Sequence, residues 1–187
     1  MSNYVSLEIL DSAMAVIQGS PAAQGTVEMI VCRPEIGERL VLEEAELDVV
    51  EGLLGDNWRS RGGPAKHNDE RHLAMQINIM NSRAIDAIAS GERDLWPLAG
   101  DQFFVDFDLS AANLPAGTRL EIGTAVVEVT EEPHLGCKKF MQRFGRDAVK
   151  FVNSDEGKAI KLRGINARVI SPGVVTNGGV ISKLAPF

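Results

Sequence analysis

Several short segments of the chain place an apolar residue at every second position. The alternation is clearest over residues 102–109. One face of that segment carries Phe103, Val105, Phe107 and Leu109, and the other carries Phe104, Asp106 and Asp108. A period of two is typical of a strand with one buried face. Apolar or β-branched runs bounded by turn residues predict further strands over residues 26–33, 39–42, 73–80, 119–122, 125–130 and 165–170.

Other segments show the spacing or the end signals of helices. Apolar residues recur at intervals of three and four near the N-terminus, and Asn81 or Ser82 can cap a later helix. Gly145 separates two short amphipathic runs. Helices are therefore predicted over residues 4–18, 82–89, 138–144 and 146–152. Residues 47–54 fit either a short helix or a loop.

Short strands separated by Gly- and Pro-containing turns predict a mostly β protein with some α structure, of the α+β class. We expect a β-barrel, or a highly curved sheet, with short peripheral helices. The length of 187 residues suits one domain. We assign residues 1–24 to an N-terminal helical extension and residues 25–187 to a single β-barrel domain.

Composition and charge argue against several classes of protein. The formal net charge of −7 disfavours general nucleic-acid binding. The longest uninterrupted apolar run, residues 13–17, is too short for a transmembrane helix. Glu8 and Asp11 stand where a signal peptide would be uncharged, so we expect a cytoplasmic protein without a membrane partner. Two cysteines cannot form a disulfide framework.

Positive charge is concentrated in one part of the chain. Residues 134–170 contain nine Lys or Arg and three Asp or Glu, a balance of +6, which leaves −13 for the remainder. A basic segment of this kind can hold a small anion such as phosphate. Two amphipathic helices with solvated basic faces would give the same pattern, and charge alone favours that interpretation.

Cys137 is the leading candidate for chemistry. It follows a turn over residues 133–136 and precedes a predicted helix, with Lys138 and Lys139 beside it. A helix N-terminus and nearby cations favour the thiolate, the form of cysteine that attacks, carries sulfur or ligates a soft metal. Gly136 would let a ligand approach the backbone. A second interpretation is equally open, in which Cys137 is a small buried residue.

His134, Cys32 and the basic residues of one loop are weaker candidates. His134 could tune Cys137 or be solvated, and no second ligand pair completes a zinc site with them. Cys32 lies in a predicted strand, where a core position is expected. The polar, Gly-rich loop of residues 55–71 could cradle an anion or be a flexible loop. Its basic residues are Arg59, Arg61 and Lys66, around Gly62 and Gly63. The common nucleotide-binding and serine-hydrolase motifs are absent.

Four stretches of the sequence resemble the MOSC domain, which is named after the C-terminal region of molybdenum-cofactor sulfurases. They are R-P-E-I-G-E-R at 33–39, G-L-L-G-D at 52–56 with the loop ending H-N-D-E-R-H, the segment 98–123 with its L-P-A-G-T-R-L-E-I-G end, and V-E-V-T-E-E-P-H-L-G-C-K-K-F at 127–140. The last stretch places Cys137 after a strand and a Pro-containing turn, as the family places its characteristic cysteine. The resemblance covers roughly residues 25–173.

This resemblance implies a MOSC-type β-barrel and one of two roles for Cys137. In the first role Cys137 carries sulfur as a persulfide, received from a pyridoxal-phosphate-dependent cysteine desulfurase. In the second role it ligates the molybdenum of a bound molybdenum cofactor (molybdopterin). The side chains expected to bind that cofactor are Lys138, Lys139, Arg143 and His134, with Arg59, Arg61 and Lys66 behind them.

We therefore expect a MOSC-domain protein that binds molybdenum cofactor, carries sulfur through Cys137, or does both. One alternative is a small molybdenum-dependent reductase of N-hydroxylated compounds, which would need an electron-donor protein. Another is a non-catalytic anion-binding module whose cysteine is structural.

Overall fold

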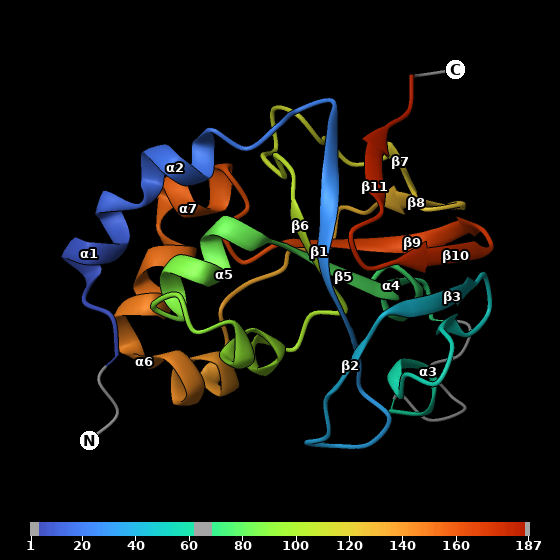
Figure 1. The fold of residues 1–187 in the computed structure, drawn as a ribbon, viewed down its shortest axis with the longest axis horizontal. Coiled ribbons are helices and arrows are strands. Elements are labelled where there is room, and N and C mark those ends of the chain that lie inside the picture. The colour runs from blue at the N-terminus through green and yellow to red at the C-terminus, as the bar shows by residue number, and fades with distance from the viewer. Residues whose placement is uncertain (1–3, 62–68, 186–187) are drawn as a thin grey trace.

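Seven strands form a closed barrel in the computed structural model, which describes residues 4–61 and 69–185 (Figure 1). The strands are β1(Gln24–Cys32), β5(Ile77–Asn81), β6(Phe103–Asp106), β7(Arg119–Ile122), β8(Ala125–Val129), β9(Ile165–Ser171) and β11(Val180–Lys183). Their order around the barrel is β1-β11-β7-β8-β9-β5-β6, and β6 pairs with β1 to close it. β5 and β6 are parallel, and the other neighbours are antiparallel. The expected α+β barrel with short peripheral helices is confirmed.

Strand β6 shows that both faces of the barrel wall are covered. Phe103 and Val105 belong to the core inside the barrel, whereas Phe104 belongs to a second core beneath the helices. The predicted alternation is confirmed, and the outward position of Phe104 is apolar because helices cover that side of the sheet. Burying a phenylalanine side chain contributes about 1.5–3 kcal/mol, so this strand stabilises both layers.

Helices cover one side of the barrel (Figure 1). They are α1(Leu7–Ser12), α2(Met14–Gln18), α5(Ser82–Ile88), the 3₁₀ helix η2(Arg93–Ala99), α6(Lys138–Asn153) and α7(Asp155–Ala159). The N-terminal helix predicted over residues 4–18 is divided at Ala13 into two short helices. The helix predicted over residues 82–89 is confirmed, and the Asn81 side chain caps it by accepting from the Ala84 N–H at 3.0 Å. Among the described residues, every helix is too short or too polar to span a lipid bilayer.

A second, smaller sheet includes part of residues 47–54, for which the sequence predicted a short helix or a loop. Within residues 47–54, residues 47–48 and 52–53 belong to two strands and residues 49–51 form the turn between them. In the first of these strands Ala45 and Leu47 are buried while Glu44 and Glu46 are exposed. The sheet has the order β10(Gly173–Thr176)-β3(Glu44–Asp48)-β4(Gly52–Leu53), and β2(Leu40–Leu42) pairs separately with β1. Strands β10 and β11 are missing from the predicted set. The short helix α3(Trp58–Arg61) lies within the loop predicted over residues 55–71. A second short helix, α4(Glu70–Leu73), begins at the end of that loop and includes the first residue of the strand predicted over residues 73–80.

Helix α6 bends at Gly145, where the sequence predicts a break between two helices. Gly145 has φ 88° and ψ 172°, outside the helical region. A Cβ at this position would lie 2.6 Å from Cγ of Tyr4, so both the backbone conformation and the available space require glycine. The first half of α6 begins at Lys138, directly after Cys137.

Candidate functional site

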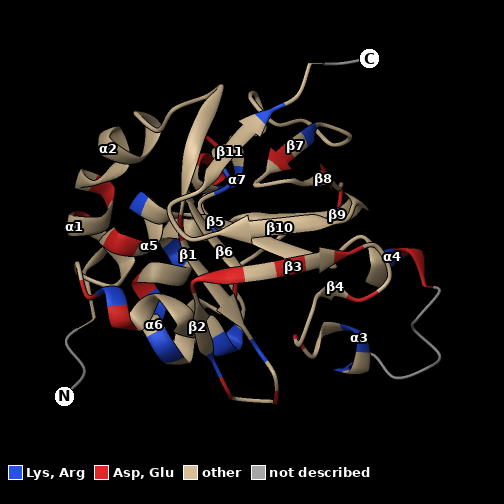
Figure 2. Cartoon of the chain, turned by 45° about the vertical axis from the view of Figure 1, so that its right-hand side comes forward, with Lys and Arg blue, Asp and Glu red and all other residues tan. Residues whose placement is uncertain are grey.

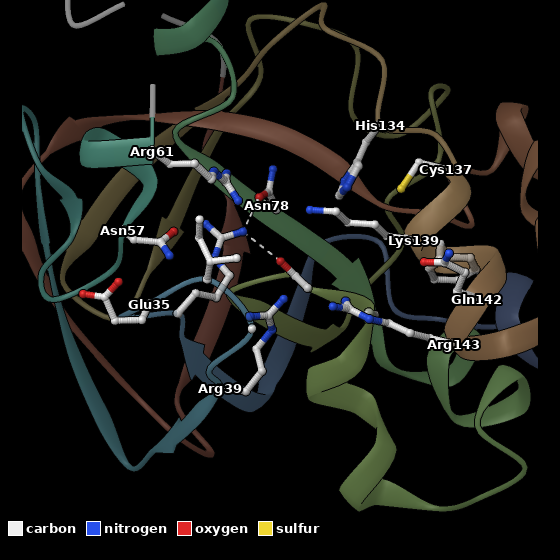
Figure 3. A pocket seen from close by; sticks show the side chains of 16 residues that line it. Glu35, Arg39, Asn57, Arg61, Asn78, His134, Cys137, Lys139, Gln142 and Arg143 are labelled. Carbon is white, nitrogen blue, oxygen red and sulfur yellow. Dashed lines mark hydrogen bonds between the residues drawn. The ribbon is translucent and has the colours of Figure 1, made fainter. Parts of the chain in front are cut away.

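A cavity of about 600 Å³ opens between the loop that follows β1 and the first half of α6 (Figure 3). It is lined by Arg33, Glu35, Ile36, Gly37, Arg39, Asn57, Arg61, Asn78, Ala99, Gly100, His134, Cys137, Lys139, Phe140, Gln142 and Arg143. These residues come from segments far apart in the sequence, which the closed barrel brings to one end.

Cys137 is the N-cap residue of α6 and lines this cavity as an exposed residue (Figure 3). Its carbonyl accepts a hydrogen bond from the Met141 N–H at 2.9 Å, and its side chain makes no capping hydrogen bond. The sulfur is therefore available to a ligand at a helix N-terminus, where unpaired N–H groups give a partial positive charge. The alternative in which Cys137 is a buried core residue is wrong.

Cys32 is buried, as the sequence predicts for a residue in a core strand. Burial raises the pKa of the Cys32 thiol, and the Asp56 carboxylate raises it further. The two cysteines therefore have opposite environments, one sealed in the core and one open to the cavity.

Gly136 has a role that differs from the one expected. Its N–H donates to Asn153 Oδ1 at 2.9 Å, and its carbonyl accepts from Asn153 Nδ2 at 3.0 Å. A Cβ on Gly136 would lie 2.8 Å from Cγ2 of Val152. The end of α6 therefore packs beside this glycine, in the space where a ligand was expected. These contacts hold the turn that positions Cys137.

Arg33 forms the floor of the cavity and is almost wholly buried. Its Nε and Nη2 donate to the two carboxylate oxygens of Asp56, each at 2.8 Å. Its Nη1 donates to Asn78 Oδ1 at 3.0 Å and to the Gly100 carbonyl at 2.8 Å. Four of the five guanidinium N–H groups are therefore used within the protein, so Arg33 contributes rigidity and at most one donor to a ligand.

Positive charge dominates the rest of the cavity wall. Its basic residues are Arg33, Arg39, Arg61, Lys139 and Arg143, and Glu35 is the acidic side chain among its described lining residues. Desolvation lowers the pKa of Arg39, and the neighbouring Arg143 and Arg33 lower it further. Desolvation also lowers the pKa of Arg61, followed by repulsion from Arg33. Arginine remains protonated at neutral pH, so an anion in the cavity would relieve this repulsion.

His134 lies between Cys137 and a buried ion pair. Its side chain is 15% exposed, and its Nδ1 is 3.5 Å from Oδ1 of Asp101, which is wholly buried. The other Asp101 oxygen accepts from Arg163 Nη1 at 2.7 Å. Desolvation lowers the pKa of His134 to about 3, and Arg163 adds to this against the opposing effect of Asp101. The expectation of a solvated His134 is wrong, because the imidazole is largely buried and neutral.

Comparisons with known proteins place this chain in a family. The family model described as "MOSC domain" matches residues 72–182, more than half of the sequence. The chain belongs to the MOSC domain family. No curated protein matches its sequence.

Several solved structures are similar in fold to this MOSC domain. The YuaD protein from Bacillus subtilis has a TM-score of 0.57 at 18% identity, covering 88% of this chain and 97% of that one. YiiM from Escherichia coli has a TM-score of 0.55 at 17% identity, covering 87% and 71%. YiiM from Geobacillus stearothermophilus has a TM-score of 0.52 at 13% identity, covering 89% and 75%. At these identities the similarity concerns the fold.

The MOSC domain brings some of the predicted site residues together and leaves others apart. Cys137, His134, Lys139, Arg143 and Arg61 all line the cavity. Lys138 is exposed and is not among the lining residues, and Arg59 lies elsewhere, donating to the Val50 carbonyl at 2.8 Å and pairing with Glu51 at 3.4 Å. Lys66 falls outside the described residues. Sequence reasoning missed Arg33, Arg39, Asn57 and Asn78, although the first two belong to the R-P-E-I-G-E-R stretch.

The basic segment of residues 134–170 does not form one anion site. Only its first part, with Lys139 and Arg143, lines the cavity. Arg163 is paired with Asp101, and Arg168 with Glu128 at 2.6 Å. Figure 2 shows Lys and Arg both on α6 and in the segments around β2, so the cation cluster of this MOSC domain is assembled from several parts of the chain.

Because His134 is buried and neutral, the free energy of unfolding should depend on pH in the acid range. In the unfolded chain His134 would titrate near its ordinary pKa of 6.5, whereas in the folded domain the pKa is about 3. Between these values the unfolded chain binds the extra proton, so the free energy of unfolding should fall by about 1.4 kcal/mol per pH unit on acidification. Urea unfolding at several pH values in this window should show a steeper acid loss for wild type than for His134→Gln. Equal slopes would contradict the assignment.

Proposed function

We propose that this MOSC domain binds a molybdenum-containing pterin cofactor, with Cys137 as the protein ligand to the metal. The observation that carries the proposal is the placement of an exposed thiol at a helix N-terminus, inside a cavity lined by five basic side chains. A thiolate is a suitable ligand for a soft metal, and cationic side chains are suitable partners for the phosphate of a pterin.

The residues present fit such a group. The Cys137 side chain makes no capping hydrogen bond, so it is free to coordinate. Among the described residues no group of three or more His, Cys, Asp or Glu side chains could hold a metal ion, and in this proposal the other ligands come with the cofactor. Arg39, Arg61 and Arg143 would hold the phosphate, while Arg33 keeps the floor of the cavity in place. A bound molybdenum would supply two-electron redox chemistry, as in a reductase of N-hydroxylated compounds served by an electron-donor protein.

The test is the metal and pterin content of protein purified from cells that make the cofactor. Wild-type protein should contain molybdenum and pterin, measured by mass spectrometry and by pterin fluorescence, and Cys137→Ser should lose most of the metal. Cys32→Ala is the matched control, because Cys32 is buried away from the cavity and should leave the metal content unchanged. Absence of molybdenum and pterin from the wild-type protein would overturn the proposal.

A second candidate function is sulfur transfer, which the exposure of Cys137 favours. In that step the Cys137 thiolate attacks the terminal sulfur of a persulfide on a cysteine desulfurase, a new S–S bond forms, and the desulfurase thiolate leaves. No further oxidant or reductant is needed. Incubation with a pyridoxal-phosphate-dependent desulfurase and cysteine should add the mass of one sulfur atom to wild type and none to Cys137→Ala. The same addition to Cys137→Ala would contradict it.

A further inference from the structure

Two buried polar atoms face each other beside the cavity without satisfying one another. Asp101 Oδ1 and His134 Nδ1 are both buried and have no hydrogen-bond partner among the described residues, although they lie only 3.5 Å apart. Buried polar atoms in folded proteins are nearly always paired, so this arrangement calls for a hydrogen bond between them. Which of the two atoms carries the hydrogen decides the chemistry of the imidazole.

Asp101 is held as an acceptor. Its Oδ2 receives the Nη1 hydrogen bond of Arg163, and Arg163 is itself buried, with its Nη2 donating to the Ala99 carbonyl at 2.9 Å. The guanidinium also lies over the ring of Phe140, 4.8 Å from its centre. Arg163 offers only hydrogen-bond donors, so Asp101 accepts from it and faces His134 with its other carboxylate oxygen.

We propose that Asp101 is a positioning residue that holds His134 as the Nδ1–H tautomer, leaving Nε2 as an unprotonated hydrogen-bond acceptor at the cavity wall. If Nε2 carried the proton instead, Nδ1 and Asp101 Oδ1 would be two acceptors facing each other in a dry site, at the cost of leaving both unpaired. The hydrogen bond from Nδ1–H to the carboxylate removes that cost. A hydrogen bond between the imidazole and the Ile165 backbone raises the pKa of His134, against the larger lowering by burial.

The consequence is a preference for one chemical class of ligand. Arginine and lysine side chains offer only donors, so the cation cluster recognises anions. His134 Nε2 adds an acceptor, and Asn57 Oδ1, which is buried without a partner among the described residues, adds another. Figure 3 shows both residues on the cavity wall, on different sides of it. The cavity thus suits a ligand that carries an anionic group and, apart from it, N–H or O–H donors. This ligand preference extends the proposed cofactor function, and the choice of ligand rests on that function.

The neutral state of His134 is what keeps this acceptor available. The groups facing the ring are the Asp101 carboxylate and the guanidinium groups of Arg163 and Arg33, and the cations disfavour a second proton on the imidazole. With a pKa of about 3, the ring remains neutral throughout the physiological range, even beside the cation cluster.

Nitrogen-15 NMR of the histidine rings in wild-type protein without added ligand tests the tautomer directly. The His134 signals are assigned as those missing from His134→Gln. We expect a protonated Nδ1 and an unprotonated Nε2 at neutral pH. A protonated Nε2, an average over both tautomers, or an imidazolium would each overturn the proposal.

Asp101→Asn then tests whether Asp101 is the cause. The asparagine oxygen should face Arg163, which offers only donors, so the amide NH₂ should face Nδ1 as a donor. The imidazole should then favour the tautomer that carries its proton on Nε2. The control is Asp106→Asn, which loses a different ion pair, with Arg83 at 2.8 Å, and should leave the tautomer unchanged. An unchanged tautomer in Asp101→Asn would overturn the role of Asp101. If that variant fails to fold, the wild-type spectrum still decides the tautomer. Neither measurement depends on molybdenum, so a failed metal assay would reject the cofactor without affecting this result.

Discussion

Asp56→Asn should lower the free energy of unfolding by about 3–5 kcal/mol, because it leaves the buried Arg33 guanidinium without its counter-charge. The two side chains are 4% and 0% exposed, so water cannot replace the lost partner. Asp56 also accepts backbone N–H bonds from Arg33 and Trp58, each at 2.9 Å. One carboxylate therefore ties the end of β1 to the start of α3.

Urea unfolding followed by circular dichroism measures this loss. Glu51→Gln is the matched control, because Glu51 forms an exposed pair with Arg59, with side chains 51% and 29% exposed. Pairs of that kind contribute about 0–1 kcal/mol. A loss for Asp56→Asn no larger than that of the control would show that the Arg33 pair is not what holds the cavity floor.

The parts of the site that could be predicted from sequence are those marked by local signals. Cys137 stands between a Pro-containing turn and an amphipathic run, and both signals lie within a few residues of it. The Asn81 cap and the Gly145 break are equally local, and both are found where expected. Local signals also identified β6, since a period of two needs no partner strand to be visible.

What could not be predicted depends on partners distant in sequence. Arg33 and Asp56 are 23 residues apart, and Arg163 and Asp101 are 62 apart, so no spacing rule connects them. Without those pairings, charge alone favoured two helices with solvated basic faces and did not show that Arg163 is buried against Asp101. The alternative of a solvated His134 is wrong for the same reason, because the partners that surround the buried ring, Asp101 and Arg163, are distant in sequence.

Replacing two cavity cations should weaken anion binding strongly and change stability little, whereas Asp56→Asn should mainly lower stability. Arg39→Gln combined with Arg143→Gln should weaken binding of inorganic pyrophosphate by at least about 100-fold, since each hydrogen bond from a charged donor contributes about 1.5–3 kcal/mol. Stability should change little. The two guanidinium groups repel each other. The hydrogen bonds that the double variant loses within the protein are those to the Glu38, Pro97 and Leu98 carbonyls.

Isothermal titration calorimetry at low salt measures this loss, with urea unfolding of the same variant alongside. Arg93→Gln combined with Arg168→Gln removes the same charge from residues outside the cavity, whose side chains are 51% and 47% exposed, and should change affinity only slightly. Because long-range attraction is screened by salt, the control difference should shrink as salt is added, whereas direct contacts in the cavity should persist. Equal weakening in both double variants would mean that the affinity for pyrophosphate depends only on the net charge of the protein. A specific loss with Arg39 and Arg143, in a domain that keeps its stability, would separate the side chains that bind the anion from Arg33 and Asp56, which hold the cavity around it.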